Sequence, residues 1–289
     1  MFNAQRSLGI ETRVIKLHEL GLYMFVDFQT SGISSTLYCT RKREEDMIQL
    51  IKNNLPAVGD IIDCGSNIGF YPILASQLAK ENQKIVCIEP DPRNYRVLEL
   101  NKQFISKNSI FLNCSASDKR KTSMLDISDA SNLNKIIRED NHQGNKFITT
   151  ECYTIDDIVR TYELKPSFLR MDIEGHEVEV LSGMKHTLKN AEGKLIIFFE
   201  LHPEQYSKSH SLESELLWMF ENGYKTKYIV SAGEEQPYAF KSLGLYPDYT
   251  VSSDGFERGV YSMIPSDAAI LLATHVPKVA RYIMLENTV

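Results

Sequence analysis

The chain has 289 residues, of which 43% are hydrophobic and 24% are charged, and its formal net charge is −6. This composition is typical of a soluble globular protein, long enough for one large α/β domain or for one and a half domains of average size. The acidic balance gives no global electrostatic reason to expect a nucleic-acid-binding protein, although a local basic patch is compatible with it.

Cysteine use and the lack of long apolar segments bear on the compartment. The five cysteines are widely spaced without a CxxC pair, and Cys64 and Cys87 fall within apolar runs, which favours buried free thiols over disulfides or a zinc site. The N-terminal residues contain no unbroken apolar core of a signal peptide, and no apolar stretch approaches the roughly 18 residues of a membrane span. We therefore expect a cytoplasmic protein without a membrane span, in a reducing compartment.

The first part of the chain has a β-like pattern. Two alternating stretches within residues 12–40, separated by Gly21, predict a β-hairpin or a short sheet. Apolar residues of 43–55 then recur on one helical face, which predicts a helix. We assign residues 1–45 to an N-terminal β extension and residues 46–289 to the main domain.

From residue 60 onward, predicted strands and helices alternate. The predicted strands cover residues 60–64, 84–90, 110–117, 167–173, 194–202, 225–230 and 280–285. The predicted helices cover residues 69–81, 92–105, 154–162, 177–190 and 211–224. This alternation is typical of a parallel sheet with helices on both faces. Residues 119–150 are polar and only weakly periodic, which predicts a surface excursion, and residues 231–280 interrupt the pattern as an insertion between the last two strands.

The stretch "DCGSNIG" at residues 63–69 joins a predicted strand to a predicted helix. Glycines in such a turn let a ligand approach backbone N–H groups and the helix N-terminus, and Asn67 is the best non-glycine substitute where φ is positive. The bulky Phe70 and the acidic Asp63 disfavour the pyrophosphate of a dinucleotide. A carboxylate suits a cationic ligand such as the ammonium group of an amino acid, which favours S-adenosylmethionine over NAD. The alternative is a structural turn that binds no ligand.

Polar side chains also follow three other predicted strands. Glu89 lies 20 residues after Gly69, where a carboxylate can accept hydrogen bonds from a ribose diol. Asp172 and Glu174 share one side of the chain if the strand stays extended, and Glu200 and His202 share a face at the end of an apolar strand. The simpler alternatives are a surface acid, acids that favour a helix N-terminus, and a strand end with satisfied polar groups.

Taken together, these motifs resemble those of the FkbM family of S-adenosylmethionine-dependent methyltransferases over residues 43–202. The resemblance rests on "DCGSNIGFY", "NCSASD", "YTIDDIV" and above all "RMDIEGHEVEVLSGM". It implies a Rossmann-like α/β class I methyltransferase fold, with a seven-stranded, mostly parallel sheet whose last strand is antiparallel. Arg170 stands where the family usually has lysine, and His176 stands where a small residue is common, so both could alter the acceptor site.

The resemblance also implies a cofactor site for S-adenosylmethionine. The residues predicted to bind it are Asp63, Gly65, Ser66, Asn67, Gly69, Phe70, Glu89, Pro90, Ser115, Ala116 and Asp172. In this assignment the glycine turn holds the methionine part of the cofactor. Glu89 binds the ribose, Ser115 and Ala116 line the adenine, and Asp172 lies near the transferable methyl group.

Members of the family are generally assigned as O-methyltransferases, which predicts a hydroxylated small molecule or glycan as the acceptor. Because an alcohol must lose its proton, a general base is expected. The candidates are Glu174, Glu200, His202 and His176. We favour His202 supported by Glu200, since imidazole has the better-matched pKa near neutral pH. Asp172, Glu200 and His202 could alternatively hold a divalent metal, although we predict none.

Residues 231–280 are then predicted to form a lid that closes over the acceptor and excludes water. The tyrosines of this insertion could stack on a sugar or an aromatic acceptor, or could pack within the loop. Three other functions stay open at this point. They are an RNA or protein methyltransferase on the same fold, an NAD-dependent oxidoreductase, which Asp63 and Phe70 disfavour, and a binding module without catalysis.

Overall fold

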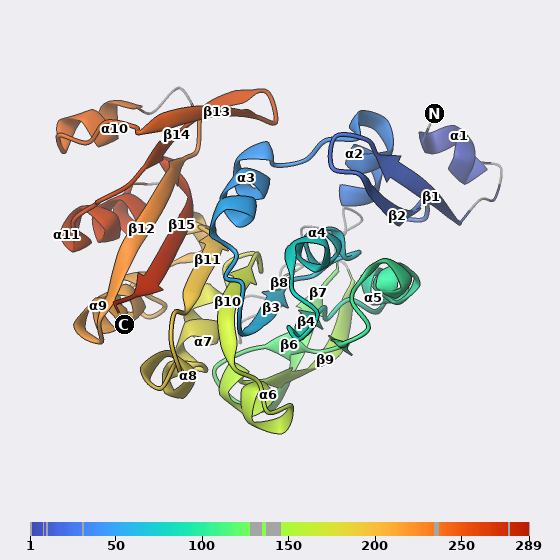
Figure 1. Ribbon diagram of the computed structural model, residues 1–289, viewed down its shortest axis with the longest axis horizontal. Coiled ribbons are helices and arrows are strands. Elements are labelled where there is room, and N and C mark those ends of the chain that lie inside the picture. The colour runs from blue at the N-terminus through green and yellow to red at the C-terminus, as the bar shows by residue number, and fades with distance from the viewer. Residues whose placement is uncertain are drawn as a thin grey trace.

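The computed structural model describes residues 2–7, 9, 11–30, 32–127, 135–136, 146–233, 237–276 and 278–288. Figure 1 shows a large sheet flanked by helices, a small second sheet, and an N-terminal extension at one end of the molecule. The five cysteines are free thiols, and all except Cys39 are buried, as predicted. Among the described residues, no helix combines the length and the apolar character that crossing a membrane requires.

The large sheet has nine strands in the order β13-β14-β12-β15-β11-β10-β3-β4-β5. The strands are β3 (Asp60–Cys64), β4 (Ile85–Ile88), β5 (Ser109–Leu112), β10 (Pro166–Met171), β11 (Ile196–Glu200), β12 (Tyr224–Ser231), β13 (Tyr249–Ser253), β14 (Phe256–Tyr261) and β15 (Ala280–Asn287). Strands β5, β4, β3, β10 and β11 pair in parallel, whereas β15 is antiparallel to both β11 and β12. The predicted seven-stranded sheet with an antiparallel last strand is confirmed, and β13 and β14 extend it beyond β12.

Helices cover both faces of this sheet because the central strands are apolar on both sides. In β11, Ile196 and Phe198 pack into one hydrophobic cluster, and Ile197 and Phe199 pack into the other. The first cluster includes residues of α3 (Glu45–Asn54), α4 (Phe70–Leu78) and α5 (Pro92–Asn101). The second includes residues of α6 (Ile155–Thr161), α7 (Glu177–Ser182), α8 (Lys185–Lys189), α9 (Leu212–Glu221) and α11 (Ser266–Ile270). The remaining short helices are α10 (Pro237–Ser242), η1 (Lys102–Phe104), η2 (Pro203–Gln205) and η3 (Leu271–His275).

The N-terminal extension contains helices as well as the predicted hairpin. Its elements are α1 (Phe2–Ser7), β1 (Thr12–Leu17), β2 (Leu22–Asp27) and α2 (Ile33–Thr40). Residues 33–40 are helical rather than extended because Ile33 and Leu37, one helical turn apart, are both buried. The Asn101 side chain fixes the hairpin to the glycine turn, since its Oδ1 accepts from the Phe25 N–H at 2.6 Å and its Nδ2 donates to the Ile68 carbonyl at 2.6 Å.

The predicted surface excursion forms part of a second sheet. This four-stranded sheet has the order β6-β9-β7-β8. Its strands are β6 (Ser115–Ala116), β7 (Lys121–Asp126), β8 (Lys135–Ile136) and β9 (Phe147–Tyr153). The strand predicted at 110–117 is therefore divided, because β5 ends at Leu112 in the large sheet and β6 pairs with β9. The rest of the predicted excursion, at 128–134 and 137–145, lies outside the described residues.

Candidate active site

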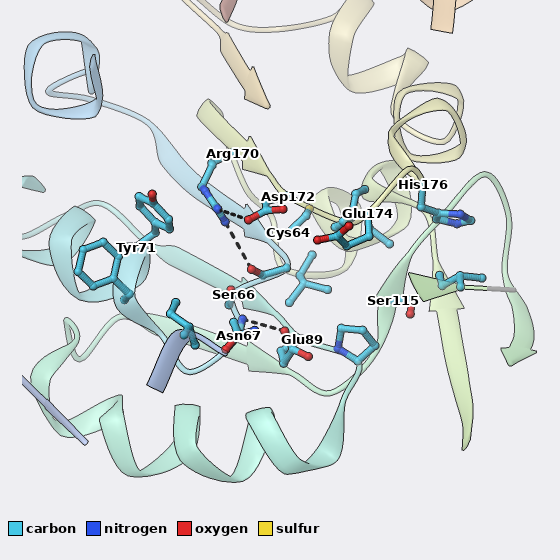
Figure 2. A pocket seen from close by; sticks show the side chains of 18 of the residues that line it. Cys64, Ser66, Asn67, Tyr71, Glu89, Ser115, Arg170, Asp172, Glu174 and His176 are labelled. Carbon is cyan, nitrogen blue, oxygen red and sulfur yellow. Dashed lines mark hydrogen bonds and ion pairs between the residues drawn. The ribbon is translucent and has the colours of Figure 1, made fainter. Parts of the chain in front are cut away.

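A cavity lies at the carboxyl ends of β3, β4 and β10, the edge at which parallel α/β sheets bind ligands (Figure 2). Eleven of the residues singled out from the sequence line it: Gly65, Ser66, Asn67, Phe70, Glu89, Pro90, Ser115, Ala116, Asp172, Glu174 and His176. The remaining predicted site residues are not among those that line it: Asp63, Gly69, Glu200 and His202. The structure therefore brings together strand ends that are far apart in the sequence.

The glycine turn forms one wall of the cavity and has a left-handed backbone at three positions. Gly65, Asn67 and Gly69 have φ values of 79°, 49° and 93°. A Cβ atom on Gly65 would lie 2.1 Å from the Asp172 carbonyl oxygen, so the close approach of β3 to the end of β10 requires glycine there. Asn67 adopts the left-handed backbone at the position where the turn would often have another glycine, as the sequence predicted. Gly69 stands behind the wall, at the start of α4.

Glu89 links the tip of β4 to the glycine turn. Its Oε2 accepts the Asn67 N–H at 2.7 Å (Figure 2). Its Oε1 accepts hydrogen bonds from the Asp91 N–H at 2.9 Å and from Asn94 Nδ2 at 3.4 Å. Burial raises the pKa of Glu89 to about 8, although these hydrogen bonds partly oppose the shift. Oε2 keeps a second lone pair, so the carboxylate can still accept a hydrogen bond from a ribose diol on the cavity side.

Arg170 separates Asp63 from the cavity. Its guanidinium contacts Asp63 Oδ1 at 3.0 Å and Asp172 Oδ2 at 2.9 Å, and it stacks 3.9 Å from the centre of the Tyr71 ring. Figure 2 shows Arg170 linked both to Asp172 and to the glycine turn, where its Nη1 donates to the Gly65 carbonyl at 3.4 Å. From the sequence Arg170 stood out only as a departure from the family's lysine. In the structure it neutralises two of the acids that line or support the site.

Asp172, Glu200 and His202 converge beside this cavity. Each offers one ligand atom, and these atoms all lie within 4.8 Å of one another, close enough for the divalent metal considered from the sequence. However, Asp172 already pairs with Arg170, and Glu200 Oε1 lies 3.4 Å from the Arg281 Nε atom. Arginines therefore pair with both carboxylates, and the absence of a metal from this cluster stays a prediction.

The favoured base, His202, is held by a residue other than Glu200. His202 Nδ1 lies 2.8 Å from Glu177 Oε1, and the Tyr206 hydroxyl donates to Glu177 Oε2 at 3.1 Å. Burial disfavours the charged imidazole, but Glu177, Glu200 and Asp172 outweigh it and raise the pKa of His202 to about 10. From the sequence, acids at the start of this helix could be explained by the helix N-terminus alone, so the role of Glu177 was missed.

Glu174 stands between His202 and the cavity. Its Oε2 lies 3.6 Å from His202 Nε2, and its own side chain lines the cavity. The backbone is left-handed at Glu174 and Gly175, with φ values of 53° and 95°, so the chain turns here instead of staying extended. Burial raises the pKa of Glu174 to about 7, against the opposing charge of His202. A non-glycine residue in this conformation is costly and is typical of functional sites.

His176 belongs to a different cluster. Its Nε2 lies 3.0 Å from the Ser117 hydroxyl oxygen, and its Nδ1 lies 3.3 Å from Glu179 Oε2. Glu179 also pairs with His210 Nδ1 at 3.2 Å. His176 thus lines the cavity near Ser115 and Ala116, on the side predicted for adenine (Figure 2).

The insertion at 231–280 supplies no residue to the cavity wall among its described residues. Tyr238 and Tyr246 are exposed, whereas Tyr261 is buried and stacks on Phe240 with ring centres 4.0 Å apart. Strands β13 and β14 extend the sheet edge instead, and the proposed lid role of the insertion stays a prediction.

Comparison with known proteins agrees with the motifs. The model of the methyltransferase FkbM domain matches residues 63–226. The hexuronic acid methyltransferase AglP of Haloferax volcanii is 26% identical over 162 residues, which cover 55% of this chain and 62% of that protein. The match thus spans less than two thirds of this relative's length.

Two solved structures are similar in outline, both with TM-scores below 0.5. The methyltransferase FkbM from Methylobacillus flagellatus has a TM-score of 0.42 at 18% identity, covering 71% of this chain and 43% of that one. The M. jannaschii TYW2 structure in complex with AdoMet has a TM-score of 0.41 at 13% identity, covering 96% and 86%.

The cavity fits the cofactor that this family uses, S-adenosylmethionine. Gly65, Ser66 and Asn67 of the glycine turn line the cavity, Glu89 lines it as the residue predicted to bind the ribose, and Asp172, Glu174 and two arginines complete its polar lining. The family match covers more than half of the chain and contains both the glycine turn and the stretch from Asp172 to Gly175. The chain belongs to the FkbM methyltransferase family.

Proposed function

We propose that the protein transfers a methyl group from S-adenosylmethionine to a hydroxyl group of a sugar or another hydroxylated small molecule. The observation that carries this proposal is the position of Glu174, a carboxylate with a pKa of about 7 that lines the cavity beside the glycine turn. The name of the Haloferax relative, a hexuronic acid methyltransferase, supports a sugar acceptor.

Bound S-adenosylmethionine would supply a methyl group on a positively charged sulfur. As the new O–C bond forms, the C–S bond breaks and its electron pair stays on sulfur, so no acid is needed for the leaving group. The proton of the acceptor hydroxyl must go to a base. The protein's other tasks are to orient the acceptor and to exclude water.

We assign to Glu174 the role of the base that accepts the proton of the acceptor hydroxyl, and to His202 a supporting role. A base near neutral pH is most effective when its pKa is close to the working pH, as that of Glu174 is. His202, with a pKa of about 10, is charged at neutral pH and has no free lone pair on Nε2. Its charge, maintained by Glu177, would favour the ionised form of Glu174 before the proton arrives.

The test uses S-adenosylmethionine with a labelled methyl group and a panel of neutral hexosides and hexuronic acid glycosides. For an acceptor that is turned over, Glu174→Gln should lower kcat by about 10²–10⁴-fold, the usual contribution of a general base. The affinity for S-adenosylmethionine should change little. As a matched control, His186→Ala alters an exposed histidine away from the cavity and should behave as the wild type.

The pH profile separates the two candidate bases. If Glu174 takes the proton, kcat rises with pH and levels off above about pH 7. If His202 takes it, kcat continues to rise towards about pH 10. Near-normal turnover by Glu174→Gln, or a profile that continues to rise well above pH 8, would rule out the assignment to Glu174.

A further inference from the structure

Arg43 is a buried cation in the cavity wall that the sequence did not single out. It lies in the segment between α2 and α3, and its side chain is only 14% exposed. One guanidinium nitrogen contacts Glu44 Oε1 at 3.0 Å. Its Nε atom is buried and has no hydrogen-bond partner among the described residues. A buried donor without a partner is costly, which suggests that a ligand completes its hydrogen bonding.

The segment that carries Arg43 is held in an unusual conformation. Arg41 and Glu44 have left-handed backbones, with φ values of 60° and 41°. The Glu44 carboxylate accepts hydrogen bonds from the Tyr71 hydroxyl and from Arg281 at 3.1 Å, and the Glu44 N–H donates to Asp254 at 3.2 Å. Contacts from α4, β15 and the β13–β14 turn thus fix Arg43 in place. Such strain persists only where the surroundings determine the conformation.

The other arginine that lines the cavity is already engaged. Arg170 contacts Asp63, Asp172 and the Met47 sulfur, the last at 3.5 Å from Nε. His176 also lines the cavity, on the side predicted for adenine. Among the described lining residues, Arg43 is therefore the arginine that retains an unpaired buried donor. It lines the cavity together with Gly65 and Phe70 of the glycine turn, which the sequence predicted to hold the methionine part of the cofactor.

We infer that Arg43 binds the carboxylate of the methionyl tail of S-adenosylmethionine. This inference rests on the cofactor use in the proposed function. Arginine suits the task because its guanidinium fork matches a carboxylate and stays charged when buried. Glu44 does not cancel this role, since its charge is shared among Arg43, Arg281 and the Tyr71 hydroxyl.

A carboxylate could also come from an acidic acceptor. Arg43 and Phe70 also line a second groove, together with Arg41, Lys42 and Lys52. In this groove, Lys42 pairs with Glu19 at 3.0 Å, and Glu45 adds a second acid. The positive charge of the groove that these acids do not balance therefore lies mostly on Arg41 and Lys52. The buried Nε of Arg43 and its position beside the glycine turn favour the cofactor as the source.

The test compares three ligands by calorimetry without any acceptor: S-adenosylmethionine, its decarboxylated form, and 5′-methylthioadenosine, which lacks the whole tail. The wild type should prefer S-adenosylmethionine over the decarboxylated form by roughly tenfold to a hundredfold, as expected for a buried hydrogen bond to a charged group. Arg43→Gln should lose that preference and bind 5′-methylthioadenosine as tightly as the wild type does. Arg43→Lys should recover part of the preference, and Arg41→Gln serves as the control.

The outcomes separate this inference from the proposed function. If Arg43→Gln keeps the wild-type preference for the carboxylated ligand, the inference is wrong even though the cofactor binds. If, in addition, this variant loses turnover only on hexuronic acid glycosides, Arg43 binds the carboxylate of the acceptor instead. A folded wild type that binds none of the three ligands would overturn both the inference and the proposed function. Unchanged binding of 5′-methylthioadenosine shows that the variant is folded.

Discussion

At the scale of single residues, Glu89 has a structural role and is also the residue predicted to bind the ribose of the cofactor. Its two carboxylate oxygens accept backbone N–H groups from Asn67 and Asp91, which tie the glycine turn to the tip of β4. The same group faces the cavity, and burial raises its pKa to about 8. In the free protein at pH 7 it is therefore mostly protonated. A ribose hydroxyl that donates a hydrogen bond to Oε2 would stabilise its ionised form.

We therefore expect cofactor binding to release a proton from Glu89. At pH 7, the release should be somewhat less than one proton per bound ligand, because the pKa falls from about 8 to below the working pH. The measurement is the binding enthalpy of 5′-methylthioadenosine, which keeps the ribose diol, in buffers with different ionisation enthalpies. Glu174→Gln should leave the release unchanged and so excludes the neighbouring base as its source. An enthalpy that is independent of the buffer would contradict this role of Glu89.

At the scale of elements, the first turn of α3 is one of the places where the insertion contacts the rest of the molecule. Asp46 is fully buried there, and its Oδ1 accepts from the Ser253 hydroxyl at 2.6 Å. Its Oδ2 lies 3.5 Å from Arg258, a side chain of β14 that is 1% exposed. Strands β13 and β14 thereby support the segment that carries Arg43 (Figure 1). The described residues of the insertion therefore contact the segment that carries Arg43 but do not line the cavity.

Asp46→Ala should destabilise the protein by about 3–5 kcal/mol, because it leaves the Arg258 guanidinium buried with only the more distant Asp254 carboxylate, at 4.0 Å, as a counter-ion. The free energy of unfolding from urea denaturation measures the effect. Asp46→Leu combined with Arg258→Met should recover much of the loss, since a buried ion pair is often replaceable by apolar residues. Glu257→Ala, on the exposed side of β14, should change the stability by no more than about 0.5 kcal/mol. Equal effects of Asp46→Ala and Glu257→Ala would show that the pair carries no stability.

At the scale of the whole molecule, strand positions were predictable and side-chain partnerships were not. Buried parallel strands are continuous apolar runs, so β3, β4, β10 and β11 are visible in the sequence, and their ends locate the cavity. Arg170 and Asp63 are 107 residues apart in the sequence, and His202 and Glu177 are 25 residues apart. No local sequence pattern therefore predicts these pairs. The strands β13 and β14 were missed because a short edge hairpin, exposed along part of its length, has only a weak alternating pattern.

The charged groups around the cavity also act together on the stability of the whole chain. Burial raises the pKa values of Glu89, Glu174 and Glu200 to about 8, 7 and 8, and the neighbouring carboxylates raise that of His202 to about 10. All four groups hold more protons in the folded state than in the unfolded state. The acids whose pKa values are lowered, such as Asp172 and Glu179, lose their contribution only below about pH 4.5 and do not act in this range.

The free energy of unfolding should therefore fall as the pH rises from 6 to 9 in the unliganded protein. The stabilisation from the three raised carboxyl groups is complete below their unfolded pKa of 4.5 and is lost as the pH rises through 7 and 8, and that from His202 is lost between 6.5 and 10. Scanning calorimetry should give a Tm at pH 9 that is at least about 5 °C lower than at pH 6. Glu200→Gln should make the decline shallower, because it removes one of the groups that must ionise. A Tm that stays constant or rises over this range would mean that the pKa values of these groups are not raised in the unliganded protein.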